Sequence, residues 1–116
     1  MTMLAQIVEE RRGSFAIARV DGEIDASNAA WVESRLRAIV TNQCDGLVVD
    51  LSSTRYLDSA GIAMMFALAA DLRRHQLELR VVVADGSSIA RMVSLTGLNG
   101  VASTHPTLDA ALADAP

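Results

Sequence analysis

Residues 47–66 decide the fold, and they read LVVDL, SSTRYL, DSAG and IAMMF in succession. The first five are nearly all apolar and rich in valine, which is typical of a strand buried on both faces. Residues 52–57 are mostly polar and predict a loop. Asp58 is a good helix N-cap and an apolar run follows it, so a helix is predicted to begin at Ser59.

The predicted position of Ser59 is chemically informative. The first turn of a helix has backbone N–H groups without intrahelical partners and carries the positive end of the helix dipole. A phosphate attached to the Ser59 hydroxyl would be well received there. On local sequence alone, the simpler interpretation of an ordinary serine at a helix start is favoured, because serine is common at such positions.

Length and composition limit the class of protein. A chain of 116 residues fits one domain, spanning residues 1–116, and 51% hydrophobic against 21% charged residues indicates a globular fold. Aromatic residues make up only 3% of the chain and the net charge is −4. Both values argue against a nucleic-acid partner, which would favour a basic surface and stacking side chains.

The sequence gives no sign of a metal site, a disulfide or a membrane segment. Cys44 is the only cysteine, and one thiol with two histidines cannot close a zinc site. We therefore expect no metal and no cofactor. The N-terminus lacks the features of a signal peptide, and the longest apolar run, Gly61–Ala70, is too short to span a bilayer. A cytoplasmic protein without membrane insertion is expected.

The rest of the chain alternates between predicted strands and helices. Strands are expected at Met3–Glu10, Phe15–Val20 with a bulge at Asp21-Gly22 and a continuation to Asp25, Leu47–Leu51, Leu77–Ala84 and Asn99–Ser103. Helices are expected from the Asp25–Asn28 caps to Val40, from Ser59 to about His75, from Ser87 to Thr96, and from Leu108 to Ala115.

This order predicts an α/β fold. We expect a mixed, mostly parallel sheet of four to five strands, an antiparallel edge strand and about four helices. Loops that follow parallel strands share one edge of the sheet, so Asp25, Ser59 and Ser87 are predicted to meet there.

Two short runs carry a resemblance to a known family. Asp50-Leu51-Ser52 is followed by Leu57 and the Asp58-Ser59-Ala60-Gly61 tetrapeptide, and Gly22-Glu23-Ile24-Asp25 lies upstream. This arrangement resembles the STAS domain and, within it, the bacterial anti-sigma factor antagonists. The resemblance covers nearly the whole chain and implies a STAS-like fold.

The resemblance also implies a function. Family members bind an anti-sigma factor that is also a serine kinase, and so free the sigma factor for transcription. The kinase supplies ATP and phosphorylates the serine of the tetrapeptide, the phosphorylated form dissociates, and a phosphatase resets it. Carried over, the phosphoacceptor is Ser59, and the protein itself is not an enzyme. Ala60 departs from the serine or threonine of many relatives, which leaves the main acceptor intact.

The expected partner contacts surround the phosphoacceptor. Asp25 and Asp58 correspond to the family's nearby acidic residues, and Ser59, Ala60 and Gly61 complete the turn. Met64 and Met65 are mostly predicted to fill the core. An outward-pointing Met64 would nevertheless suit an adaptable binding surface, so we include Met64 among the expected contacts.

Three alternatives remain open from the sequence. Asp25 and Asp50 would make a poor Mg²⁺ site without a phosphate-binding loop, so the capping of loop amides is favoured. A small α/β enzyme would need a base beside Ser59, and neither His75 nor His105 lies in a motif that supplies one. A STAS-like structural subunit, for example of a lipid-transport ABC system, would keep the fold without phosphorylation.

Overall fold

The computed structural model describes residues 4–41 and 43–114. The strands are β1 (Ala5–Arg12), β2 (Phe15–Ile24), β3 (Gly46–Asp50), β4 (Thr54–Leu57), β5 (Glu78–Val82) and β6 (Ser103–His105). The helices are α1 (Ala29–Ile39), α2 (Ser59–Arg74), α3 (Ser88–Thr96) and α4 (Leu108–Ala111), and Leu98–Gly100 forms a short 3-10 helix, η1. This alternation confirms the predicted α/β class.

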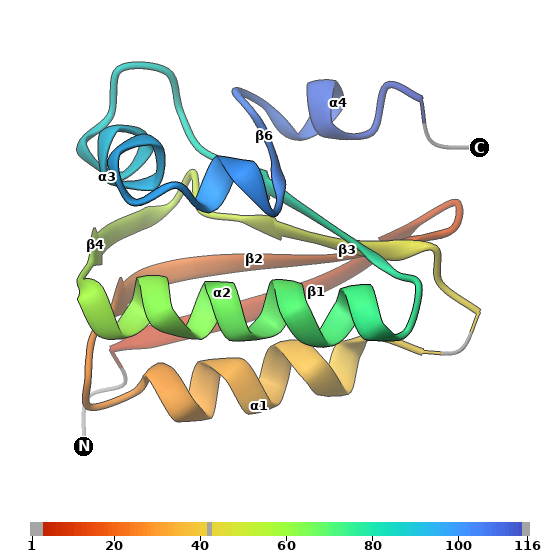
Figure 1. The fold of residues 1–116 in the computed structure, drawn as a ribbon, viewed down its shortest axis with the longest axis horizontal. Coiled ribbons are helices and arrows are strands. Elements are labelled where there is room, and N and C mark those ends of the chain that lie inside the picture. The colour runs from red at the N-terminus through yellow and green to blue at the C-terminus, as the bar shows by residue number, and fades with distance from the viewer. Residues whose placement is uncertain (1–3, 42, 115–116) are drawn as a thin grey trace.

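The strands form one mixed sheet in the order β1-β2-β3-β5-β6, with β4 paired to β2 beyond the end of β3 (Figure 1). β1 runs antiparallel to β2 at the edge, and the other pairs are parallel. The antiparallel edge strand is therefore confirmed; its expected beginning at Met3 lies outside the described residues. None of the helices at residues 4–41 and 43–114 is long and apolar enough to cross a membrane.

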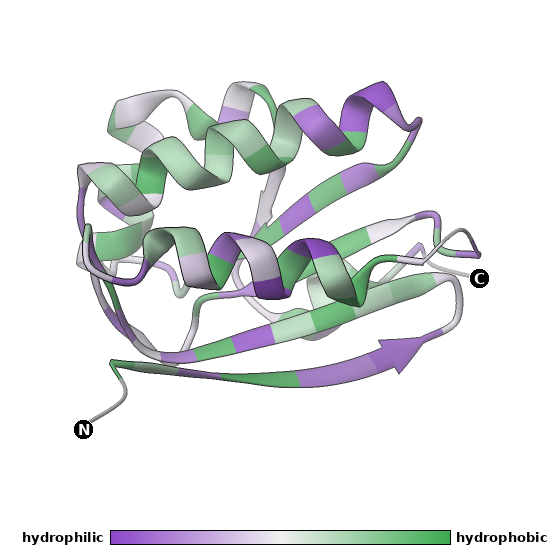
Figure 2. Cartoon of the chain, turned by 90° about the horizontal axis from the view of Figure 1, so that it is seen from below, coloured by the Kyte–Doolittle hydropathy of each residue, from purple (hydrophilic) through white to green (hydrophobic). Residues whose placement is uncertain are grey.

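The side chains of β2 alternate between two apolar clusters. Ala16, Ala18 and Val20 belong to the main core, which lies between the sheet and the helices α1, α2 and α3. Phe15 and Ile17 belong to a smaller cluster on the other face, where α4 packs. The edge strand β1 differs from the buried β2, because its C-terminal end is hydrophilic, as Figure 2 shows. Charged side chains of this kind are usual on an edge strand.

Three segments differ from the sequence prediction, the first being the last helix, α4, which ends at Ala111 although it was expected to run to Ala115. Residues 52–57 were expected to form a loop, but Thr54–Leu57 form β4, which gives the sheet six strands. The strand is held by its neighbour, because the Thr54 hydroxyl donates to the Val20 carbonyl at 2.8 Å. The last strand is β6 at Ser103–His105 rather than Asn99–Ser103, because Leu98–Gly100 form η1.

β2 pairs with two successive partners along its length, and its register with the second is irregular. Phe15–Arg19 pair with β3, and Gly22–Ile24 pair with β4, with a register shift between Gly22 and Glu23. Gly22 has a φ of +129°, which favours glycine, and a Cβ there would collide with the Leu4 carbonyl oxygen. The bend or bulge predicted at Asp21-Gly22 is thus confirmed as an irregular register next to Gly22.

We predict that Gly22→Ala destabilises the protein by about 2–4 kcal/mol, because a side chain adds backbone strain and a clash with Leu4. Urea denaturation would measure the free energy of unfolding. Gly100→Ala is the matched control, since nothing lies within 4 Å of a Cβ at Gly100, and it should cost less than about 0.5 kcal/mol. Equal stability of the two variants would contradict the strain and the clash that we assign to a side chain at Gly22.

Candidate functional site

Ser59 is the first residue of α2 and its side chain is exposed. The preceding Asp58 caps the helix: its Oδ1 accepts hydrogen bonds from the backbone N–H groups of Ala60 (3.0 Å) and Gly61 (3.1 Å). The helical ladder then begins with the bond from Ile62 N–H to the Asp58 carbonyl at 3.0 Å. The predicted N-cap is confirmed, and it holds Ser59 at the surface.

The cap changes one expectation about this turn. The sequence suggested that open N–H groups would receive a phosphate on Ser59, but two of those groups already bind the Asp58 carboxylate. A phosphate at Ser59 would therefore meet a neighbouring negative charge instead of those two amides.

Gly61 allows α2 to approach the end of β2. The residue is buried, and a Cβ at this position would collide with Leu57 Cδ1 and lie 3.1 Å from Ile24 Cγ2. The Asp58 N–H also donates to the Ile24 carbonyl at 3.3 Å. Because Asp25 follows Ile24 directly, this contact brings Asp25 to the beginning of α2.

Asp25 lies in a tightly hydrogen-bonded turn. Its Oδ1 accepts from the Ser27 hydroxyl at 2.6 Å and from the Ser27 N–H at 2.8 Å. Asn28 braces the same turn, accepting from Asp25 N–H and donating to the Glu23 carbonyl, both at 2.9 Å. The hydrogen bonds from Ser27, with that of the hydroxyl largest, lower the pKa of Asp25 below its ordinary value of 3.8.

Asp25 and Asp58 line one shallow depression at the edge of the molecule. The other residues around it are Glu23, Ala26, Ser27 and Tyr56. Tyr56 was not among the site residues predicted from the sequence, because residues 52–57 were predicted to form a loop and not a strand beside Asp25. Its side chain is 49% exposed, and the buried–exposed–exposed–buried pattern of β4 gives little signal by itself.

The strand ends gather the predicted residues at one edge. α1, α2 and α3 follow β2, β4 and β5, which run parallel in the sheet, and the starts of the three helices lie together at the left of Figure 1. Ser87 caps α3 by accepting from Ala90 N–H at 3.1 Å. The predicted common edge of Asp25, Ser59 and Ser87 is confirmed.

Met64 is buried, which confirms the main prediction that it fills the core, whereas the alternative of an outward-pointing contact residue is wrong. Its side chain is only 4% exposed and belongs to the main core. α2 packs against the sheet, α1 and η1, so the buried arc of the helix is wide. The exposed position on this turn is Ala63.

Asp50 caps a loop, as the sequence favoured. Its Oδ1 accepts from the Ser52 hydroxyl at 2.6 Å and the Ser52 N–H at 2.9 Å. Asp25 uses Ser27 in the same manner, so both carboxylates are engaged with serine side chains and backbone amides. Within the described part of the chain, no three histidine, cysteine or acidic side chains gather as a metal site would require.

These features define a small α/β domain in which the exposed Ser59 follows Asp58 at the start of α2, at the same edge of the sheet as Asp25. The chain belongs to the STAS domain family, whose sequence model matches residues 6–111. The family resemblance stated above is thereby confirmed.

The most similar proteins include several anti-sigma factor antagonists. The chain is 33% identical over 97 residues to the anti-sigma-F factor antagonist RsfB of Mycobacterium tuberculosis, covering 84% of this chain and 78% of RsfB. It is 30% identical over 94 residues to the anti-sigma-B factor antagonist of Listeria monocytogenes, covering 81% and 82%. The crystal structure of an anti-sigma factor antagonist from Mycobacterium paratuberculosis has a TM-score of 0.83 and 30% identity, covering 94% and 92%.

We predict that Ser27→Ala raises the pKa of Asp25 toward 3.8, because the hydroxyl bond that favours the carboxylate is lost. Since the folded-state pKa lies below the unfolded value, the associated stability is complete above the unfolded pKa. It disappears as the pH falls through the folded-state pKa. A carboxyl-carbon NMR titration of both proteins measures the midpoint. An unchanged midpoint for Asp25 would show that Ser27 does not control its ionisation.

Proposed function

We propose that this protein is an anti-sigma factor antagonist, which binds an anti-sigma factor with serine kinase activity and releases it when Ser59 is phosphorylated. The relatives named above support the partner class. The observation that carries the switch is the exposed Ser59 hydroxyl at the start of α2, within the family's tetrapeptide. The kinase supplies ATP, a phosphatase resets the serine, and the protein catalyses no reaction.

The switch acts through charge. A phosphoserine adds between about −1.5 and −2 charges at pH 7. The Asp58 carboxylate already accepts hydrogen bonds from two backbone amides of the turn. The Asp25 carboxyl, whose pKa lies below its ordinary value, is also ionised at neutral pH. The added charge therefore joins an edge that is already acidic, on a chain of net charge −4. A partner that packs over this edge must remove water from that charge, which weakens binding.

The fold is expected to survive the modification. Ser59 is exposed, and the contacts that fix the turn come from Asp58, Gly61 and Ile24. Asp25, Asp58, Ser59, Ala60 and the backbone of Gly61 remain the proposed contact residues for the partner. Met64 is removed from that set because it is buried.

We predict that the cognate kinase and ATP add a single phosphate to the wild-type protein and none to Ser59→Ala. Intact-mass spectrometry followed by peptide mapping would measure this. Ser27→Ala is the matched control, because it removes a hydroxyl from the same edge and should be phosphorylated like the wild type. Stoichiometric phosphate on Ser59→Ala would show that another residue is the acceptor.

We also predict that Ser59→Asp binds the anti-sigma factor more weakly than the unmodified wild-type protein does. Ser59→Ala is expected to bind the anti-sigma factor as tightly as the unmodified wild-type protein. A loss of ~3 kcal/mol for the phosphorylated protein corresponds to a more than ~100-fold higher Kd, and aspartate mimics part of that effect. Titration calorimetry with the purified anti-sigma factor measures the series. Identical affinities would reject the charge mechanism and favour a structural subunit.

A further inference from the structure

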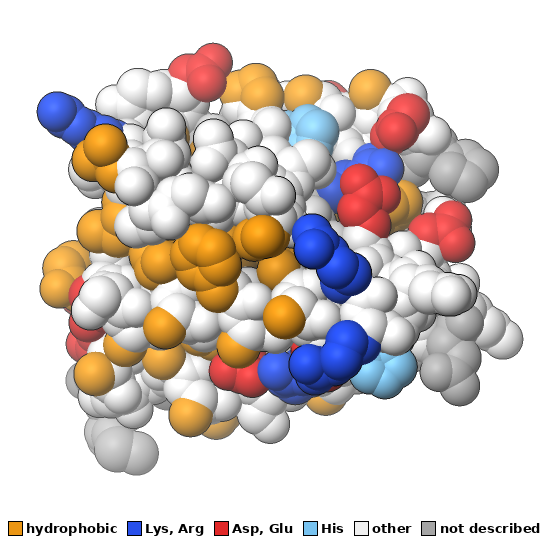
Figure 3. Space-filling model, viewed as in Figure 1, with side chains coloured by type: hydrophobic (Ala, Val, Ile, Leu, Met, Phe, Trp, Pro, Cys, Tyr) orange, Lys and Arg blue, Asp and Glu red, His pale blue; other side chains and the backbone are white. Residues whose placement is uncertain are grey.

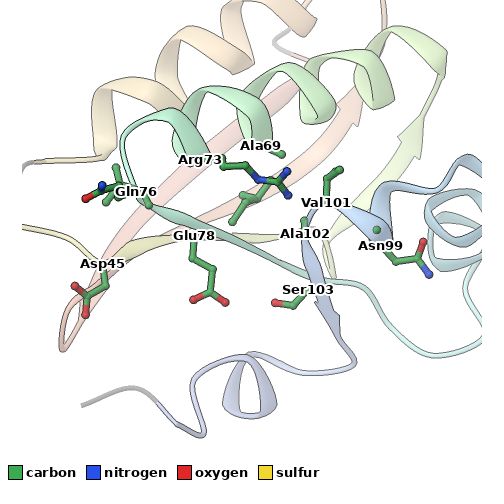
Figure 4. Close-up of a pocket in the computed structure, with 12 residues that line it drawn as sticks. Asp45, Ala69, Arg73, Gln76, Glu78, Asn99, Val101, Ala102 and Ser103 are labelled. Atoms are coloured by element: carbon green, nitrogen blue, oxygen red, sulfur yellow. The ribbon is translucent and has the colours of Figure 1, made fainter.

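A groove of about 620 Å³ lies away from the Ser59 edge, between the second half of α2 and the segment from Asn99 to Ser103. Its apolar lining includes Ala69, Leu79 and Ala102. Figure 4 shows Arg73 extending from α2 across the groove toward Val101 on the other side. Val101 is 36% exposed, so an apolar side chain remains open at the rim.

The outer face of α2 connects this groove to Ser59. No charged residue occurs between Ser59 and Ala70, although Ala63, Ala67 and Ala70 are exposed. Figure 3 shows hydrophobic side chains along this helix and in the space between α2 and the α3–η1 segment. A helix that is apolar on all sides is normally buried, so this exposed face is expected to be covered in a complex.

We propose that an amphipathic helix of the anti-sigma partner lies along the outer face of α2 and ends in this groove. The proposal rests on the proposed function. The alanine side chains allow the backbone of the partner helix to come close, and the half-buried Phe66 and the exposed Val101 supply larger apolar contacts. α2 has 16 residues, so the contact can extend about 24 Å along its axis.

The charges around the groove set the polarity of that partner helix. Arg73 lies on the α2 side, whereas Asp45 and Glu78 line the other side. A partner helix that fits this arrangement presents a carboxylate to Arg73 and a basic side chain to Asp45 and Glu78. Complementary charges of this kind fix the register of the contact more than they increase its affinity.

The proposed contact also explains why phosphate at Ser59 would end binding. Ser59 begins the same uncharged face, so its phosphate would lie at the edge of an apolar interface. A phosphate placed in such an interface disrupts it through the cost of desolvation. The regulated residue and the apolar contact surface therefore belong to one helix.

The test uses Ser59→Ala as the parent protein, so that phosphorylation cannot affect the affinity. Ala67→Glu and Ala70→Glu place a charge on the outer face of α2 and should each raise the Kd for the anti-sigma factor by about 30-fold. Ala38→Glu is the matched control: Ala38 is exposed on α1, and its replacement should change the Kd by less than about twofold. Titration calorimetry measures all four proteins, and circular dichroism checks that each melts like the parent.

Unchanged affinities of Ala67→Glu and Ala70→Glu would overturn the proposed contact while leaving the proposed function intact. No binding of the parent to the anti-sigma factor would overturn both. If sedimentation shows a dimer that Ala67→Glu dissociates, a second copy occupies the face and the partner-helix proposal is wrong. If either glutamate variant unfolds, Arg73→Glu replaces it, because this change alters only an exposed charge at the groove. Its Kd for the anti-sigma factor should also rise, and an unchanged Kd would overturn the proposed contact.

Discussion

The contact between the end of β2 and the start of α2 is the constraint on which the site depends. The Asp58 N–H donates to the Ile24 carbonyl at 3.3 Å, and the missing side chain of Gly61 lets the helix pack against Ile24. β4 lies beside the last residues of β2, with a register shift between Gly22 and Glu23, and leads directly into α2. Asp25 and Ser59 come from distant parts of the sequence, and this packing holds them at one edge.

The sequence predicted α2 accurately because its signals are local. Asp58 is a capping residue directly before an apolar run, and the helix begins at Ser59 as expected. β4 could not be predicted in the same way, because only Thr54 and Leu57 are buried and the pairing with β2 makes the strand. Met64 fills the core as the main prediction had it, and the alternative of an outward-pointing side chain failed because several neighbouring elements cover a wide arc of α2.

The site combines three kinds of surface on a short stretch of chain. Carboxylates of Asp25 and Asp58 are held by Ser27 and by helix amides, so their positions are fixed before any partner arrives. Ser59 is neutral, the helix that it begins carries no charge up to Ala70, and the proposed phosphorylation would add charge to this surface. A change of charge at Ser59 therefore alters the surface offered to a partner, with little effect expected on the core beneath it.

That claim is tested most directly by comparing ¹H–¹⁵N NMR spectra of the unmodified and the Ser59-phosphorylated protein. The account predicts that shift changes are confined to the edge formed by residues 23–28 and 56–63, while the amides of β1, β5 and the second half of α2 stay unchanged. Shift changes spread through the core strands would contradict it, because phosphorylation would then act by altering the fold rather than the charge of the surface.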